Sequence, residues 1–250
     1  MIVEGNSPAE CWLKILQKIL SRSGREISPL EVRINNVSIV PPYQKELEED
    51  INNFLSKIRQ PSIEKTAGTI FPQSLIGGKQ SVYQRYEKIW SHIQKDHKNK
   101  RGTYFQRMTS WGRMSGDNIN QLQLIVDTYK GVDGVRKGVH RRSALIATIF
   151  DPRIDHTHQP MLGFPCLQQV CIVPHDDEVM EMNAIYAMQY LSTRAYGNYA
   201  GLMRLGEFMA REMGLKFTHL NCMISTISLG DKMNKSEAEV LLKKYVQYVK

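Results

Sequence analysis

The sequence has 250 residues, of which 42% are hydrophobic and 23% are charged. These values are typical of globular proteins and argue against a disordered or fibrous chain. No apolar run reaches the roughly 18 residues of a membrane-spanning helix, and the first residues lack the apolar core of a signal peptide, so no membrane partner is expected.

The formal net charge of +8 favours anionic partners, such as nucleotide phosphates, polyglutamate tails or nucleic acid. The basic residues are scattered, with the densest run from Lys95 to Arg101, so charge alone does not choose among these partners. The four cysteines form no CxxC pair and no metal-finger spacing. So few cysteines in a large chain predict reduced thiols and therefore a cytoplasmic location.

The first predicted element is a helix with a clear start. Ser7 has the residue type of an N-cap, Pro8 suits the first helical position, and Glu10 completes a capping-box pattern. An apolar stripe follows, and Gly24 is expected to end the helix. The alternation of apolar residues from Val32 to Ile39 then predicts extended structure.

Amphipathic patterns predict helices at 44–60, 81–96 and about 117–130. The stretch between the first two contains Pro61, Pro72 and two adjacent glycines, and it is predicted to be a flexible loop.

The second half is rich in strand-forming residues. Strands are predicted at 143–150, 167–173, 179–190 and 217–229. A helix over 197–213 interrupts them, capped by Gly214, and a short helix behind Asn234 follows. Clustered strands with long helices before and among them favour an α+β fold over regular βαβ alternation.

Cys166 stands between a loop rich in turn formers, HTHQPMLGFP, and a predicted strand. A cysteine at such a junction is often partly exposed, and nearby arginines lower a thiol pKa and favour the nucleophilic thiolate. The alternative interpretation is a core cysteine at the start of a strand.

Arg141 and Arg142 precede the strand predicted at 143–150. Paired guanidinium groups suit phosphate oxygens, because each offers a planar fork of donors. The alternative is two ordinary surface arginines.

Several metal-ligand residue types occur near Cys166, but their spacing does not define a third fixed ligand, and no metal site is predicted. They are His156, His158, His175, Asp176 and Asp177.

Five segments, taken in order, resemble the thymidylate synthase and pyrimidine hydroxymethylase family, closest to its shorter archaeal-type branch. The resemblance covers roughly residues 101–229, and the opening helix SPAECWLKILQKIL is also similar, whereas residues 30–100 are divergent. The five segments are TYFQRMTSW (103–111), DNINQLQLIVDTYK (117–130), HRRSALIATIFDP (140–152), GFPCLQQVCIV (163–173) and GNYAGLMRLGEFMAREMGL (197–215).

The resemblance implies one thymidylate synthase-like domain over residues 1–250, with a mixed β-sheet packed with helices and a homodimer formed through that sheet. It also implies a transferase of nucleotide biosynthesis. In this family a cysteine thiolate adds to C6 of a pyrimidine nucleotide, which makes C5 nucleophilic. The cofactor 5,10-methylenetetrahydrofolate then supplies one carbon, as a methyl or hydroxymethyl group.

The same resemblance assigns roles to residues. Cys166 would be the nucleophile, and Asn198 would bind the pyrimidine edge; an asparagine suits uracil, which offers both a donor and an acceptor. Arg141 and Arg142 would bind the phosphate of the partner subunit's nucleotide. Tyr104 and Trp111 would line the cavity near the base and the folate.

The sequence departs from the family pattern at five positions. The family's phosphate-binding arginine and serine, its folate-binding aspartate, and the histidine and tyrosine that hold the ribose are replaced, in this order, by Ala187, Met188, Tyr190, Thr226 and Ser228. Arg194 is a candidate replacement for the lost arginine, or else an ordinary solvated side chain.

Three hypotheses therefore follow from the sequence. The chain is a one-carbon transferase acting on a pyrimidine nucleotide, with Cys166 as the nucleophile. Alternatively, it is a degenerate protein of the same fold that binds nucleotide or a protein partner without the standard reaction. The third hypothesis, motivated by the +8 charge, is a nucleic-acid-binding or base-modifying protein.

Overall fold

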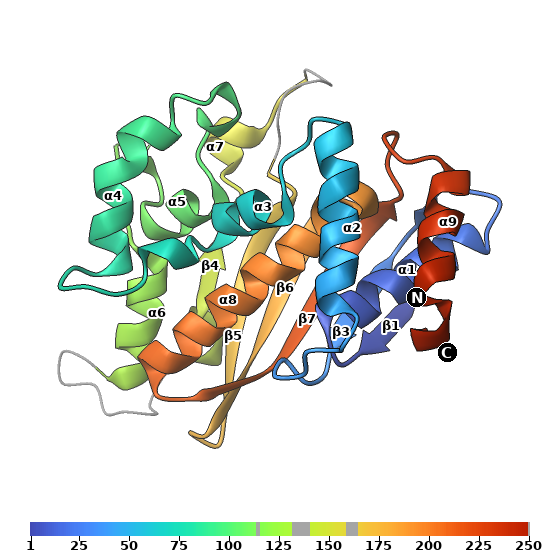
Figure 1. Cartoon of the computed structure of the whole chain (residues 1–250). Helices are drawn as coiled ribbons and strands as arrows, with labels where there is room; N and C mark the ends of the chain where they lie inside the picture. Colours follow the sequence, from blue (N-terminus) through green and yellow to red (C-terminus); the bar gives the residue numbers. More distant parts are fainter. Residues whose placement is uncertain (114–115, 132–140, 159–164, 250) are drawn as a thin grey trace.

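The computed structural model describes residues 1–113, 116–131, 141–158 and 165–249 (Figure 1). Its centre is a seven-stranded sheet in the order β1-β3-β7-β6-β5-β4, with β2 paired to β7. The β1–β3 and β6–β7 pairs are parallel and the others antiparallel. The strands are β1 (Ile2–Gly5), β2 (Glu26–Ile27), β3 (Leu30–Ile34), β4 (Ile146–Thr148), β5 (Leu167–His175), β6 (Val179–Tyr190) and β7 (Lys216–Ser228).

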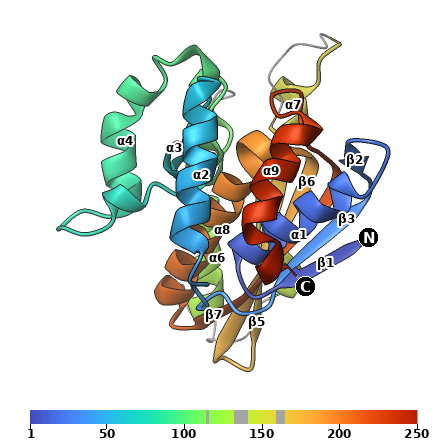
Figure 2. The same cartoon turned by 45° about the vertical axis from the view of Figure 1, so that its right-hand side comes forward.

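The helices gather on one face of this sheet, as Figures 1 and 2 show from two directions. Strand residues that point toward the helices are buried, while those on the opposite face of β6 and β7 are partly or fully exposed. The helices are α1 (Pro8–Leu20), α2 (Gln44–Lys57), α3 (Ile63–Ile70), α4 (Val82–Ile93), α5 (Tyr104–Thr109), α6 (Gln121–Lys130), α7 (Pro152–Asp155), α8 (Tyr196–Met213) and α9 (Lys235–Tyr245).

The predicted α+β class with a mixed, helix-packed sheet is confirmed. Strands from both halves of the chain lie in the same sheet, because β7 pairs with β3 on one side and with β6 on the other. Within the described residues, none of the helices has the length and apolar character needed to cross a membrane.

Helix α1 begins as its sequence predicts. The Ser7 hydroxyl accepts a hydrogen bond from the Glu10 N–H at 3.1 Å, and Pro8 is the first helical residue. The Glu10 carboxylate accepts from the Asn6 N–H at 2.8 Å. The helix ends at Leu20, before Gly24 is reached. Its buried Trp12 indole N–H donates to the Leu191 carbonyl at 2.9 Å and so ties α1 to the segment after β6.

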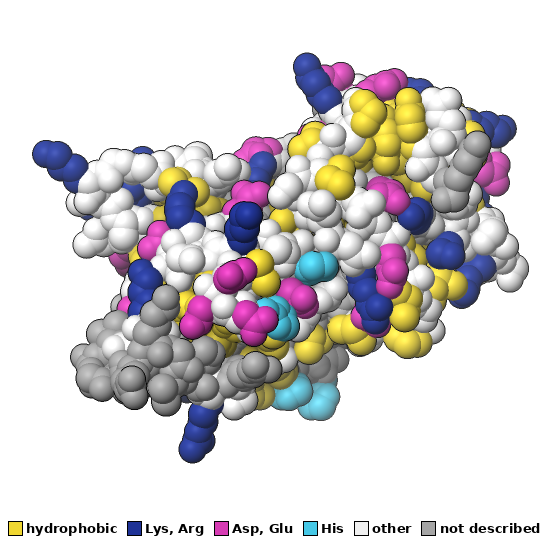
Figure 3. Space-filling view, turned by 90° about the horizontal axis from the view of Figure 1, so that it is seen from below, with side chains coloured by type: hydrophobic (Ala, Val, Ile, Leu, Met, Phe, Trp, Pro, Cys, Tyr) yellow, Lys and Arg dark blue, Asp and Glu magenta, His cyan; other side chains and the backbone are white. Residues whose placement is uncertain are grey.

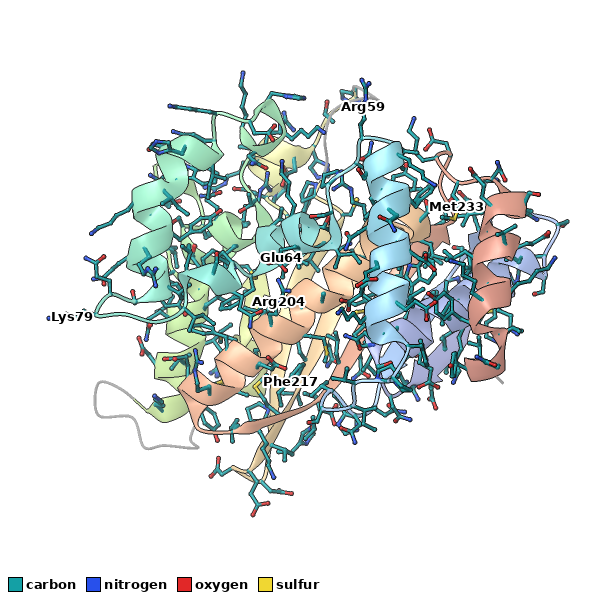
Figure 4. The ribbon with its side chains drawn as sticks, in the orientation of Figure 1. Arg59, Glu64, Lys79, Arg204, Phe217 and Met233 are labelled. Atoms are coloured by element: carbon teal, nitrogen blue, oxygen red, sulfur yellow. The ribbon has the colours of Figure 1, made fainter. Side chains whose placement is uncertain are left out.

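Helix α8 makes the crossover that two adjacent parallel strands require, here between β6 and β7. Gly214 ends it in the left-handed conformation, with φ of 73°. The helix lies against α3, to which the ion pair of Arg204 with Glu64 also joins it, at 2.9 and 2.6 Å (Figure 4).

Three sequence predictions were wrong in detail. The predicted loop between α2 and α4 contains α3, whose N-cap Ser62 accepts from the Lys65 N–H at 3.2 Å. The extended segment ends at Ile34 rather than continuing to Ile39. The strand predicted over 143–150 shortens to β4, because residues 142–144 form a 3-10 turn.

Candidate functional site

Cys166 lies immediately before β5 and is held in place by the sheet. Its carbonyl accepts a hydrogen bond from the Ala187 N–H of β6 at 2.9 Å. The β5–β6 register is irregular between Leu167 and Gln169, at the point where the strand begins. The β5–β6 hairpin is at the bottom of Figure 1, so Cys166 belongs to the opposite end of the sheet. The side chain is half-buried, as the loop-to-strand position predicts.

Tyr104, the first residue of α5, reaches this end of the sheet. Its hydroxyl lies beside the Cys166 thiol and beside the backbone N–H groups of Cys166 and Leu167. Burial raises the pKa of this phenol above its usual value, although the two N–H groups and Arg194 oppose the shift. Tyr104 is therefore a neutral phenol at the thiol.

Arg194 approaches the same two groups from a third segment. It lies in a π-helical turn, Leu191–Ala195, that joins β6 to α8. Such turns occur frequently at functional sites. The guanidinium lies close enough to Cys166 and Tyr104 to favour the anionic form of each. The structure thus brings together Cys166, Tyr104 and Arg194, all three of which the sequence nominated.

The pKa of the Cys166 thiol differs from the expectation that nearby arginines lower it below its usual value. Burial raises the pKa of Cys166, and Arg194 offsets only part of this effect. In the single chain at neutral pH, the thiol therefore keeps its proton.

Asn198 lies in the first turn of α8 and is buried, with 4% of its surface exposed. Tyr196, two residues earlier, donates from its hydroxyl to Glu48 of α2 at 2.9 Å. Two residues correspond to a rotation of about 200° around a helix, so Asn198 faces away from α2.

Arg141 is exposed, and the structure gives no side-chain position for Arg142. Ile146 of β4 pairs with Cys171, five residues along β5 from Cys166. Since a strand rises about 3.3 Å per residue, this pairing is about 16 Å from the start of β5. Arg141 is joined to this end of β4 by a 3-10 turn, so β4 enters the sheet well away from the Cys166 of its own chain.

Trp111 follows α5, and its backbone pairs with Ile119 through hydrogen bonds of 2.8 and 3.1 Å. It lines a cavity of about 20 Å³, enough for roughly one water molecule. Of the three arginines around this cavity, Arg107 pairs with Asp155 and Arg113 with Glu87, whereas one guanidinium nitrogen of Arg101 is buried without a partner among the described residues. The cavity beside Trp111 does not fit a folate ring.

The positions that depart from the family pattern are neighbours in the structure. Met188 of β6 pairs with Thr226 of β7, and Tyr190 pairs with Ser228. The Ser228 hydroxyl accepts from the Gly230 N–H at 3.2 Å, which makes it part of a turn. The replaced contacts thus come from one region where β6 and β7 end side by side.

Two buried polar residues near this end of the sheet were not predicted from the sequence. Tyr186 is fully buried and lies opposite Leu167, the residue after Cys166, across the β5–β6 ladder. Gln189 is 1% exposed and accepts from the Tyr199 hydroxyl at 2.9 Å. The sequence offered one signal for Gln189, which is a polar residue within the apolar segment IYAMQYL. It offered none for Tyr186, because a tyrosine in a strand is an ordinary core residue.

The histidines singled out in the sequence do not form a metal centre with their neighbours. His156 packs edge-on against Phe150, with ring centroids 5.2 Å apart, and His175 pairs with Glu181 at 3.4 Å. In the part of the chain that the structure describes, no three His, Cys, Asp or Glu side chains are placed to hold a metal ion.

No protein-family model matches the chain, and no curated protein matches it in sequence. The resemblance to thymidylate synthases therefore remains a prediction.

Proposed function

We propose that the protein binds a pyrimidine nucleotide at Cys166 and transfers one carbon to C5 of the base through a covalent adduct between the cysteine sulfur and C6. The observation that carries this proposal is the meeting of Cys166, Tyr104 and Arg194 from three separate segments of the chain. A guanidinium close to a half-buried thiol favours the thiolate, which is the nucleophilic form.

Each residue has a defined part in this chemistry. As the sulfur–C6 bond forms, the electrons of the C5–C6 double bond move toward C5 and the O4 carbonyl. C5 then attacks a one-carbon electrophile, and loss of the C5 proton with departure of sulfur restores the double bond. Arg194 stabilises the thiolate and is placed to bind an anionic ligand. Asn198 pairs with the donor and acceptor of the uracil edge.

The resemblance names 5,10-methylenetetrahydrofolate as the donor of the carbon. Because the cavity beside Trp111 has room for about one water molecule, the described residues do not support folate binding there. The experiment below therefore separates covalent addition from the identity of the donor.

The test is the intact mass of the protein after incubation with 5-fluoro-deoxyuridylate, with and without methylenetetrahydrofolate. Fluorine at C5 blocks the step that releases the enzyme, so an adduct is expected. Cys166→Ala should abolish it. Cys171→Ala, a half-buried cysteine on the same strand, is the matched control and should retain it. An adduct that needs methylenetetrahydrofolate identifies the donor, whereas an adduct formed without it shows covalent addition at Cys166 but identifies no donor. A folded wild-type protein that forms no adduct in either case contradicts the proposed reaction.

A second candidate function is nucleotide binding without turnover. The neighbouring replacements at the ends of β6 and β7, together with the raised pKa of Cys166, favour it. Loss of several charge-assisted hydrogen bonds, each contributing about 1.5–3 kcal/mol, would weaken the family's standard complex by orders of magnitude. This function predicts that deoxyuridylate binds while the fluorinated nucleotide forms no adduct.

We further propose that the site is completed in a homodimer. The strand that follows Arg141 enters the sheet about 16 Å from the Cys166 of its own chain, and the resemblance assigns the arginine pair to the site of a second copy. The sheet face that the helices leave uncovered offers a surface for that copy. On it, Ile185 and Met223 are paired neighbours with 36% and 47% exposure.

A further inference from the structure

Tyr186 carries a polar group that the fold does not use. Its side chain is fully buried, and its hydroxyl makes no hydrogen bond with any residue that the structure describes. A buried hydroxyl without a partner lowers the stability of a fold, and phenylalanine would fill the same space without this cost. Such a group in a native protein calls for an explanation, and a role in binding or chemistry is one.

The position of Tyr186 relates this hydroxyl to the candidate site. Tyr186 lies directly opposite Leu167 across the β5–β6 ladder, and the N–H of the following residue, Ala187, donates to the Cys166 carbonyl at 2.9 Å. The hydroxyl interacts electrostatically with Cys222 most strongly, and also with Tyr104, Tyr199 and Cys166. The pairing with Leu167 therefore places Tyr186 at the end of the sheet where Cys166 and Tyr104 lie.

The surroundings make this hydroxyl a donor. Burial raises the pKa of Tyr186 well above its usual value, so the phenol keeps its proton. Tyr199, its other phenolic neighbour, already donates to the Gln189 carbonyl oxygen at 2.9 Å. The Gln189 amide nitrogen is likewise buried without a partner among the described residues. Two donors here, the Tyr186 hydroxyl and the Gln189 amide nitrogen, have no acceptor among the described residues, and carbonyl oxygens of a ligand would suit both.

We propose that the Tyr186 hydroxyl is a ligand-binding group, which donates a hydrogen bond to a carbonyl oxygen of the pyrimidine held at Cys166. This inference rests on the proposed function and adds a specificity-determining residue to it. Tyr186 contacts the base from the sheet side, while Asn198 contacts it from α8.

The experiment compares Tyr186→Phe with Tyr83→Phe. The Tyr83 hydroxyl is also buried without a partner in the described part of the chain, but its charged neighbours are Glu212 and Asp127 and not the groups of the candidate site. In the absence of ligand, both variants should melt at or above the wild-type temperature. Calorimetric titration with deoxyuridylate should then show at least tenfold weaker binding to Tyr186→Phe and unchanged binding to Tyr83→Phe.

Each other outcome has a defined meaning. If Tyr186→Phe melts several degrees below wild type, the hydroxyl has a structural partner and the inference is wrong. If Tyr186→Phe binds deoxyuridylate as tightly as wild type, the inference is wrong and the proposed function stands. If the wild-type protein does not bind deoxyuridylate, the proposed function and this inference are both overturned.

Discussion

Arg194 and Cys166 form a pair in which one side chain controls the reactivity of the other. Burial opposes ionisation of the thiol and the guanidinium favours it. Arg194→Gln should therefore raise the thiol pKa further. At a pH below the pKa, the thiolate fraction falls about tenfold each time the pKa rises by one, so alkylation of Cys166 by iodoacetamide at pH 8 should slow by about three- to tenfold.

The measurement is the rate of Cys166 alkylation, followed by peptide mass across pH 6–10, and its midpoint should move to higher pH in Arg194→Gln. Arg204→Gln on α8 is the control, because its guanidinium pairs with Glu64. An unchanged midpoint in Arg194→Gln would show that the two side chains do not interact.

At the scale of residues, the sequence predicted those site residues that have a distinctive chemistry or a distinctive position. Cys166 stood out at a loop-to-strand junction, and Tyr104 through its place in a family-like segment. Tyr186 gave no such signal, because its role depends on which side chains surround its hydroxyl in three dimensions. The raised pKa of Cys166 was equally hidden, since burial outweighs a neighbouring charge only when the depth of the site is known.

At the scale of elements, the close approach of α3 to α8 depends on glycine at position 201. A Cβ at Gly201 would lie 2.8 Å from the Ala67 carbonyl oxygen and 2.9 Å from the Ile70 Cβ. Gly201→Ala should therefore force the helices apart and destabilise the protein by about 1–3 kcal/mol. Gly68→Ala, on α3 itself, meets nothing within 4 Å and should stabilise the helix by about 0.5–1 kcal/mol.

Urea unfolding measures the free energy of unfolding of each variant, which should fall for Gly201→Ala and rise for Gly68→Ala. Equal effects of Gly201→Ala and Gly68→Ala would mean that the helix contact is not close enough to exclude a methyl group.

Local signals explain which elements the sequence could predict. Asn234 and Glu237 form a complete capping box, and Gly214 ends α8 in the left-handed conformation, so both helices were predicted near their observed positions. Helix α3 was missed because it has only eight residues, contains Gly68 and lies in a segment that begins and ends with proline. Such a short helix is stabilised mainly by its packing on α8, which no local pattern reveals.

At the scale of the whole molecule, the +8 charge does not gather into one field on the face shown in Figure 3, where basic and acidic side chains are interspersed. Nucleic-acid binding depends on a continuous basic surface. This face therefore offers no continuous basic surface of the kind that nucleic-acid binding uses, whereas nucleotide binding needs only a few basic residues at one site.

In the proposed homodimer, each candidate site contains residues from both chains. In a twofold symmetric interface each substitution acts twice, so Met223→Lys on the uncovered sheet face should convert a dimer into monomers. Leu124→Lys is the control, since Leu124 is 53% exposed on α6, away from that face. Sedimentation at micromolar concentration measures both. A wild-type protein that sediments as a monomer, or a Met223→Lys variant that stays dimeric, contradicts this interface.

Mixing two inactive variants tests whether the chains share their sites. Cys166→Ala lacks the nucleophile, and the double variant Arg141→Ala, Arg142→Ala lacks the proposed phosphate arginines. In a mixed dimer, one site receives Cys166 from the double variant and both arginines from the other chain. Random exchange of equal amounts should therefore restore adduct at about a quarter of the sites, although neither variant forms it alone. No recovery after exchange into mixed dimers would mean that the arginines act in their own chain and not across the interface. Adduct formed by the double variant alone would place the arginine pair outside the site, and Arg194 would then be the remaining candidate for the phosphate.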